Sequence, residues 1–124
     1  MNAPLIGPIT LVLGASERPD RYANMAVRRL RAHGHAVVAV GLRAGLIGDV
    51  PIDTALPSVP VDTVTLYVGP VNLEQWREAL LKLQPRRIIF NPGTEHPPFE
   101  ADASAQGIAV EVGCTLVMLA AGTY

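Results

Sequence analysis

The stretch from Ile9 to Arg31 constrains the fold more than any other part of the chain. It begins with ITLVLG, a short aliphatic and β-branched run that is typical of a strand buried on both faces. It ends with ANMAVRRLR, where the arginines are directed toward solvent and apolar residues recur at helical spacing, at Ala23, Ala26, Val27 and Leu30. A polar turn, ASERPDRY, joins the two pieces. A buried strand that leads through one turn into an amphipathic helix predicts a unit of a parallel α/β sheet.

The turn before this helix has the features of an anion site. Gly14 ends the strand, and the first backbone N–H groups of any helix lack a carbonyl partner within it. Those N–H groups and the helix dipole favour an anion, most often a phosphate. Arg18 and Arg21 add positive charge in the same turn. The stretch therefore predicts a site for the phosphates of a nucleotide.

Composition limits the class of protein. A chain of 124 residues with 49% hydrophobic and 5% aromatic residues fits one domain, spanning 1–124, with an aliphatic core. The net charge of −1 gives no broad electrostatic footprint for nucleic acid. Cys114 is the single cysteine, which excludes an internal disulfide and favours a reducing, cytoplasmic setting. We expect no secretion signal, and no apolar run approaches the roughly 20 residues that span a membrane.

The rest of the chain alternates between strand and helix patterns. A second buried strand is expected at 36–40, further strands at 63–68, 87–91 and 108–112, and a short edge strand at 50–52. Helices are expected from Asn72, whose spacing from Gln75 is that of a capping box, and at 99–106. Residues 114–121 are expected to form a terminal helix or a further strand. This alternation predicts a single-domain, doubly wound parallel sheet of five to six strands with helices on both faces. The expected strand order is 3-2-1-4-5-6.

In such a sheet, ligands bind outside the carboxyl ends of the strands, where the strand order reverses. Loops 14–22, 41–43 and 68–70 should converge there, with 91–94 beside them. The first turn has one glycine where the dinucleotide fingerprint has three, and it is not a P-loop either. Gly41 and Arg43 follow the second strand, where NAD enzymes carry an acid. A cation there suits the 2′-phosphate of NADP or the 3′-phosphate of coenzyme A, although Arg43 could also be a solvated loop residue.

Five segments carry a resemblance to a known family. They read GASERPDRY at 14–22, AVGL at 39–42, GDVPI at 48–52, IFNPGTE at 89–95 and CTLV at 114–117. Together they resemble the small, stand-alone CoA-binding proteins, which share a Rossmann-like fold with the CoA-binding domain of succinyl-CoA synthetase. The family more often has Asn-Pro where this chain has Gly41-Leu42.

The resemblance implies binding of coenzyme A or acyl-CoA and supplies no reaction. The backbone N–H groups of residues 15, 16, 22 and 23 and the Ser16 hydroxyl would hold the pyrophosphate, and Arg43 would meet the ribose phosphate. Residues 68–70 would form an apolar wall, and 91–94 would line the pantetheine path. The expected contact residues are Gly14, Ala15, Ser16, Arg18, Arg21, Tyr22, Ala23, Gly41, Arg43, Val68, Gly69, Pro70, Asn91, Pro92, Gly93 and Thr94. The alternatives are that the two turn arginines serve surface solubility and that 91–93 is only a tight turn.

No catalytic or metal-binding set can be assembled from the sequence. Cys114 could lie near a thioester or be a small buried hydrophobe, and His96 could be a base or an exposed loop histidine. The histidines have no metal-ligand spacing. We therefore expect a non-catalytic binding module, alone, as a homo-oligomer or with a partner protein. The alternatives are a small NADP-dependent oxidoreductase or redox protein, and a CoA-binding partner subunit of a larger acyl-CoA ligase.

Overall fold

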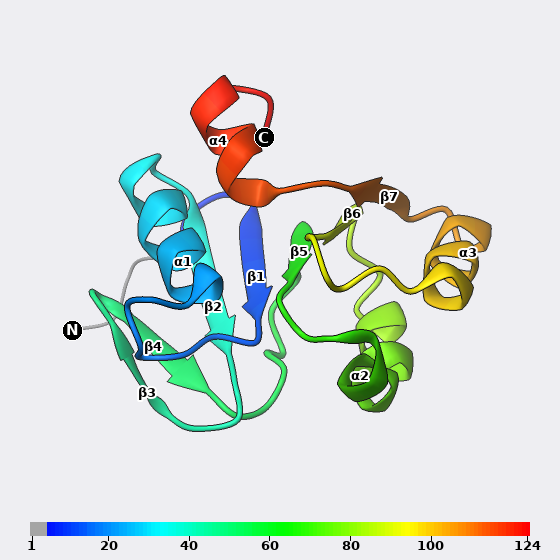
Figure 1. Cartoon of the computed structure of the whole chain (residues 1–124), viewed down its shortest axis with the longest axis horizontal. Helices are drawn as coiled ribbons and strands as arrows, with labels where there is room; N and C mark the ends of the chain where they lie inside the picture. Colours follow the sequence, from blue (N-terminus) through cyan, green and yellow to red (C-terminus); the bar gives the residue numbers. More distant parts are fainter. Residues whose placement is uncertain (1–4) are drawn as a thin grey trace.

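The computed structural model describes residues 5–124, which form one sheet flanked by helices (Figure 1). The strands are β1 (Ile9–Leu13), β2 (Ala36–Val40), β3 (Gly45–Ile47), β4 (Val50–Asp53), β5 (Thr63–Leu66), β6 (Arg87–Phe90) and β7 (Ala109–Val112). The helices are α1 (Tyr22–Ala32), α2 (Pro70–Lys82), α3 (Pro97–Ala105) and α4 (Thr115–Ala121). The strands lie in the order β3-β4-β2-β1-β5-β6-β7. Apart from β3, this is the predicted order.

The prediction of five to six strands, all parallel, was wrong. The sheet has seven strands and is mixed, because β3 pairs antiparallel with β4 through Gly45 and Ile52. The remaining pairs are parallel. The two strands of the antiparallel pair are joined by Gly48 and Asp49, which matches a two-residue hairpin turn. At three residues, β3 is too short to show the alternation that marks a strand in a sequence.

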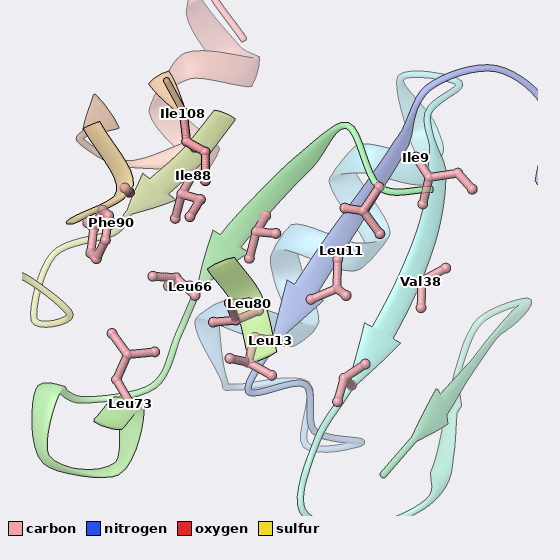
Figure 2. Close-up of a cluster of buried hydrophobic side chains, with 14 of the residues drawn as sticks. Ile9, Leu11, Leu13, Val38, Leu66, Leu73, Leu80, Ile88, Phe90 and Ile108 are labelled. Atoms are coloured by element: carbon pink, nitrogen blue, oxygen red, sulfur yellow. The ribbon is translucent and has the colours of Figure 1, made fainter. Parts of the chain in front are cut away.

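β1 is buried on both faces, as its sequence predicts. Leu11 and Leu13 point into one apolar core, where side chains of α2 and α3 cover the sheet (Figure 2). Val12 points into the other, which is closed by residues of α1 and α4. Helices therefore lie on both faces, as predicted. A central strand with both faces covered is what a doubly wound fold requires.

Two helices begin at different residues from those predicted. α2 begins at Pro70, with Gly69 as its N-cap and no side-chain cap, so the predicted capping box of Asn72 and Gln75 does not form. α3 begins at Pro97, and Nδ1 of His96 caps it by accepting the N–H of Phe99. His96 is therefore buried rather than exposed in a loop. Within residues 5–124, no helix has both the length and the apolarity needed to cross a bilayer.

Candidate functional site

The loops at the carboxyl ends of four neighbouring strands enclose a cleft of about 930 Å³. These loops follow β2, β1, β5 and β6, in that spatial order. Of the predicted contact residues, those that line the cleft are Gly14, Ala15, Ser16, Arg18, Arg21, Tyr22, Ala23, Gly41, Arg43, Val68, Gly69, Pro92, Gly93 and Thr94. Pro70 and Asn91 are not among its lining residues. The strand-order reversal thus brings together most of what the sequence proposed.

Two glycines allow the cleft loops to approach one another closely. Gly14 has φ +95, and a Cβ there would lie 2.7 Å from the carbonyl oxygen of Tyr67. A Cβ on Gly41 would lie 2.2 Å from the carbonyl oxygen of Ala15. Backbone atoms cannot move aside as a flexible side chain can, so a larger residue at either position would push the loops apart. Both glycines therefore shape the cleft.

The amino end of α1 opens into the cleft without a side-chain cap. Arg21 is the N-cap and makes no capping hydrogen bond, and the first turn holds no acidic residue. The first helical bond runs from the N–H of Met25 to the carbonyl of Arg21, so the N–H groups of Tyr22 and Ala23 have no partner within the helix. Since both residues line the cleft, the positive end of the helix dipole faces it.

One of the predicted phosphate donors is committed elsewhere. The N–H of Ala15 donates to the carbonyl of Val40 at 3.0 Å, as does that of Gly14 at 2.8 Å. These bonds tie the end of β1 to the end of β2. The expectation that the Ala15 N–H faces the phosphates is therefore wrong, because the sheet ladder continues one residue beyond the strand. Ser16 keeps its hydroxyl at the cleft, where its oxygen accepts the N–H of Arg18.

A small hydrogen-bonded network holds the loop between β1 and α1 in place. Asn24, which is buried, donates from Nδ2 to the carbonyl of Ser16 at 2.8 Å. Arg28 donates from Nε to Oδ1 of Asn24 at 2.8 Å and from its guanidinium to the carbonyl of Pro19 at 3.3 Å. The sequence directs Arg28 to solvent, and it is exposed, yet it also braces this loop. A loop fixed in this way loses little conformational freedom when a ligand binds.

Charged side chains in the cleft are mostly arginines. Arg18 makes an exposed pair with Asp20 at 3.5 Å, and within residues 5–124 no ion pair involves Arg21 or Arg43. Glu17 lies in the same loop, but its Oε2 accepts the N–H of Leu46 at 3.0 Å. The carboxylate is thus held by the backbone of β3, and the site retains an excess of positive charge.

A second wall of the cleft was not predicted from the sequence. Asn72, Gln75 and Trp76 project from α2 into the cleft, beside Tyr67 and Val68. The sequence predicts a capping box formed by Asn72 and Gln75, which would occupy both side chains. The spacing i, i+3, i+4 on one helix face was the available signal, since residues at that spacing share a face.

Asn91 is a structural residue beneath the cleft rather than a lining residue. Its Nδ2 donates to Oγ1 of Thr65 at 2.7 Å and to the carbonyl of Leu66 at 2.8 Å. Its Oδ1 accepts the N–H of Thr115 at 2.9 Å. Asn91 therefore joins β5 to the start of α4, and both N–H donors of its amide are used within the fold. Its predicted place on the pantetheine path is not what the structure shows.

Two further reactive side chains, Tyr67 and Cys114, belong to the elements around the cleft. Burial raises the pKa of Tyr67 to about 12, and the nearby hydroxyls of Thr115 and Thr65 act in the opposite direction. Among the described residues, the buried Tyr67 hydroxyl has no hydrogen-bond partner. Cys114 is half-buried at the start of α4 and is not part of the cleft lining. No group of three or more His, Cys, Asp or Glu in residues 5–124 is placed to hold a metal.

Comparisons with known proteins bear on this geometry. The profile of a family described as "CoA binding domain" matches residues 9–120. A solved structure described only as an uncharacterized protein has 45% identity and a TM-score of 0.90, covering 94% of this chain and 98% of that chain. Cell-free ID.343 from Thermus thermophilus has 26% identity and a TM-score of 0.85, covering 94% of this chain and 90% of its own.

A larger enzyme contains a similar fold. Acetyl-coenzyme A synthetase 1 of Ca. Korarchaeum cryptofilum, in complex with phosphate and ADP, has 16% identity and a TM-score of 0.72. The match covers 90% of this chain but 26% of the enzyme's chain, and at this identity it shows the fold alone. No curated protein matches the chain.

Proposed function

This chain belongs to the CoA binding domain family, and from that premise we propose that it binds coenzyme A or acyl-CoA in the cleft without catalysing a reaction. The observation that carries the proposal is the uncapped amino end of α1, which opens into a cleft lined by Arg18, Arg21 and Arg43. Unpaired N–H groups and arginine forks are the groups that proteins use to hold phosphate oxygens.

The parts of the ligand are assigned to successive loops. The N–H groups of Tyr22 and Ala23 and the Ser16 hydroxyl bind the pyrophosphate, with Arg18 and Arg21 supplying charge. Arg43, which follows β2, meets the ribose phosphate. The apolar wall beside the adenosine or the start of the pantetheine is built from 68–69, and 92–94 line the path beyond. Asn91 and the Ala15 N–H have no part in this assignment, since their hydrogen bonds are used within the fold.

Non-catalytic binding is favoured by the chemistry of the lining side chains. Arginine does not release its proton near neutral pH. Tyr67 has a pKa of about 12 and a buried hydroxyl. Glu17 accepts a backbone hydrogen bond from Leu46, which holds its carboxylate away from the phosphates. Such groups bind and orient an anion but are poorly suited to general acid–base work, which needs a pKa near the working pH.

Titration calorimetry with coenzyme A, ADP and NADPH tests the proposal. We expect coenzyme A to bind most tightly, because it carries both the pyrophosphate and the ribose 3′-phosphate. A small NADP-dependent oxidoreductase or redox protein is the second candidate, since Arg43 also suits a 2′-phosphate. Binding of NADPH with no response to coenzyme A would establish that second candidate and overturn the first. Mass spectrometry of any small molecule released when the purified protein is denatured gives an independent answer.

A third candidate is a CoA-binding partner subunit of a larger acyl-CoA ligase. It is favoured by one finding, that a fold similar to this chain makes up 26% of a much longer acetyl-coenzyme A synthetase chain. If this candidate is right, the isolated protein binds coenzyme A weakly, and a second chain co-purifies with it and raises the affinity. Tight binding by the isolated protein would argue against a need for such a partner.

A further inference from the structure

We infer that one face of α2, formed by Asn72, Gln75 and Trp76, binds the neutral, amide-bearing arm of the ligand and accommodates an uncharged acyl group. This α2 face is distinct from the loops to which the phosphates are assigned. The inference rests on the proposed function, that the ligand is coenzyme A or an acyl-CoA. It adds where the arm lies and which class of acyl group fits.

The position of these three residues follows from where α2 begins. With Gly69 as the N-cap and Pro70 as the first helical residue, the helix needs nothing from the side chains of Asn72 and Gln75. Both are exposed and line the cleft, and within residues 5–124 neither side chain makes a hydrogen bond. Each carries an amide with two donors and one acceptor oxygen. These donors and acceptors can hydrogen-bond to the two amide groups of a pantetheine arm.

The order of the strands separates charged from neutral walls. The cleft loops follow β2, β1, β5 and β6. At about 4.8 Å between neighbouring strands, the β2 end of the cleft lies about 14 Å from its β6 end. Every arginine in the lining comes from the loops after β2 and β1. The described residues that line the cleft after β5 and β6 include no lysine or arginine. A ligand with phosphates at one end and an uncharged arm at the other fits this order.

Trp76 decides the character of the neutral end. Its half-buried ring packs against the core cluster on one side and lines the cleft on the other. In the loop after β6, Oε1 of Glu95 accepts the N–H of Gly93 at 2.8 Å, which places a carboxylate near this end. A dicarboxylic acyl group would bring a second carboxylate to this end. No cation lines the cleft here, so that carboxylate would be desolvated without a cationic partner. An uncharged acyl group is therefore the class that fits.

Trp76 is the only tryptophan in the chain, so its fluorescence reports directly on the α2 face. Titrations with coenzyme A and with adenosine 3′,5′-diphosphate compare ligands with and without the pantetheine arm. We expect coenzyme A to change the Trp76 emission and adenosine 3′,5′-diphosphate to leave it unchanged. In the double variant Asn72→Ala/Gln75→Ala, the affinity for coenzyme A should fall about tenfold, because two hydrogen bonds are lost. The affinity for adenosine 3′,5′-diphosphate, measured by calorimetry, should not change.

The matched control is Glu78→Gln, an exposed change on α2 outside the cleft, which should leave both affinities as they are. Malonyl-CoA should bind about tenfold more weakly than acetyl-CoA, since only the former carries a carboxylate.

If coenzyme A binds but leaves the Trp76 emission unchanged, or binds the double variant as tightly as the wild type, the inference is overturned and the proposed function stands. Equal binding of the two thioesters overturns the assignment of the acyl class. If neither coenzyme A nor adenosine 3′,5′-diphosphate binds, the proposed function itself fails and the inference goes with it.

Discussion

Replacing Arg18 and Arg21 with alanine is the most direct test of the phosphate site. Both side chains line the cleft, and Arg18 makes only an exposed pair with Asp20 at 3.5 Å, its side chain being 65% accessible. Exposed pairs of this kind contribute about 0–1 kcal/mol to stability. Without ligand, the free energy of unfolding of the double variant Arg18→Ala/Arg21→Ala should therefore lie within about 0.5 kcal/mol of the wild-type value. Any large effect must then come through the ligand.

The size of the ligand effect follows from linkage. Coenzyme A at a hundredfold excess over its dissociation constant should stabilise the wild type by about 2.7 kcal/mol. Each arginine should contribute about 1.5 kcal/mol to binding, the lower end for hydrogen bonds to charged groups, because both arginines are exposed. Loss of both lowers the affinity about 150-fold, which leaves about 0.3 kcal/mol of stabilisation. At about 4 °C per kcal/mol, the shift in Tm should fall from about 11 °C to about 1 °C.

Differential scanning fluorimetry with and without coenzyme A measures these shifts. The double variant Arg29→Ala/Lys82→Ala removes the same charge from exposed positions outside the cleft, and it should keep the full wild-type shift. If Arg18→Ala/Arg21→Ala also keeps that shift, the arginines do not touch the phosphates and the site has been placed at the wrong turn. If the control loses the shift as well, the effect is one of overall charge.

Three further predictions concern stability, the first two at residues that line the cleft. Tyr67→Phe removes a buried hydroxyl that has no partner among the described residues, so Tm should stay the same or rise by up to about 4 °C. Gly41→Ala places a Cβ 2.2 Å from a backbone oxygen and should cost about 1–3 kcal/mol in urea unfolding, whereas Gly69→Ala meets nothing within 4 Å and should be neutral. Asp62 pairs with Arg86, whose guanidinium holds the pKa of Asp62 below its ordinary 3.8. Asp62→Asn should therefore cost about 0.5 kcal/mol at pH 7, and this cost should disappear as the pH falls through the depressed pKa.

Each of these predictions has a contradicting result. A fall in Tm for Tyr67→Phe would show that the hydroxyl is satisfied, by an ordered water for example. Equal stability of the two glycine variants would mean that the loop after β1, which contains the Ala15 carbonyl, is free to move. For Asp62, the pair stabilises the fold only while the carboxylate is charged. A cost that grew on acidification would therefore have the wrong sign for a carboxyl group whose pKa is lowered by folding.

Local patterns predicted the elements that depend on their own residues. The continuous apolar run of β1 and the helical spacing of Ala23, Val27 and Leu30 identified the central strand and α1, because burial on these elements repeats with a fixed period. The strand order followed from chain connectivity and the handedness of crossovers. The cleft loops followed from that order, which is why most predicted contact residues do line it.

The errors at Asn91 and His96 share one cause, which is competition between partners distant in sequence. The sequence places Asn91 on the pantetheine path or in a tight turn, and the turn does form, since the N–H of Thr94 donates to the Asn91 carbonyl. The pantetheine assignment fails because the Asn91 amide is used by Thr65 and Thr115, which lie 26 and 24 residues away. His96 reads as a loop residue, but it caps α3 and its Nε2 bonds to Glu74 of α2. A polar side chain bonds to whichever partner the fold presents, and leaving a buried polar group unpaired costs free energy.

The sequence by itself determined most of the strands and helices, the order of the central strands, and the turn that carries arginines at the start of α1. Hydrophobic period and the right-handed crossover rule suffice for these, since both act on neighbouring elements. Only the tertiary structure decided that β3 pairs with β4 and that Asn72, Gln75 and Trp76 face the cleft. Those outcomes depend on where packing sets the first residue of α2 and on backbone pairing in a strand too short to carry a pattern.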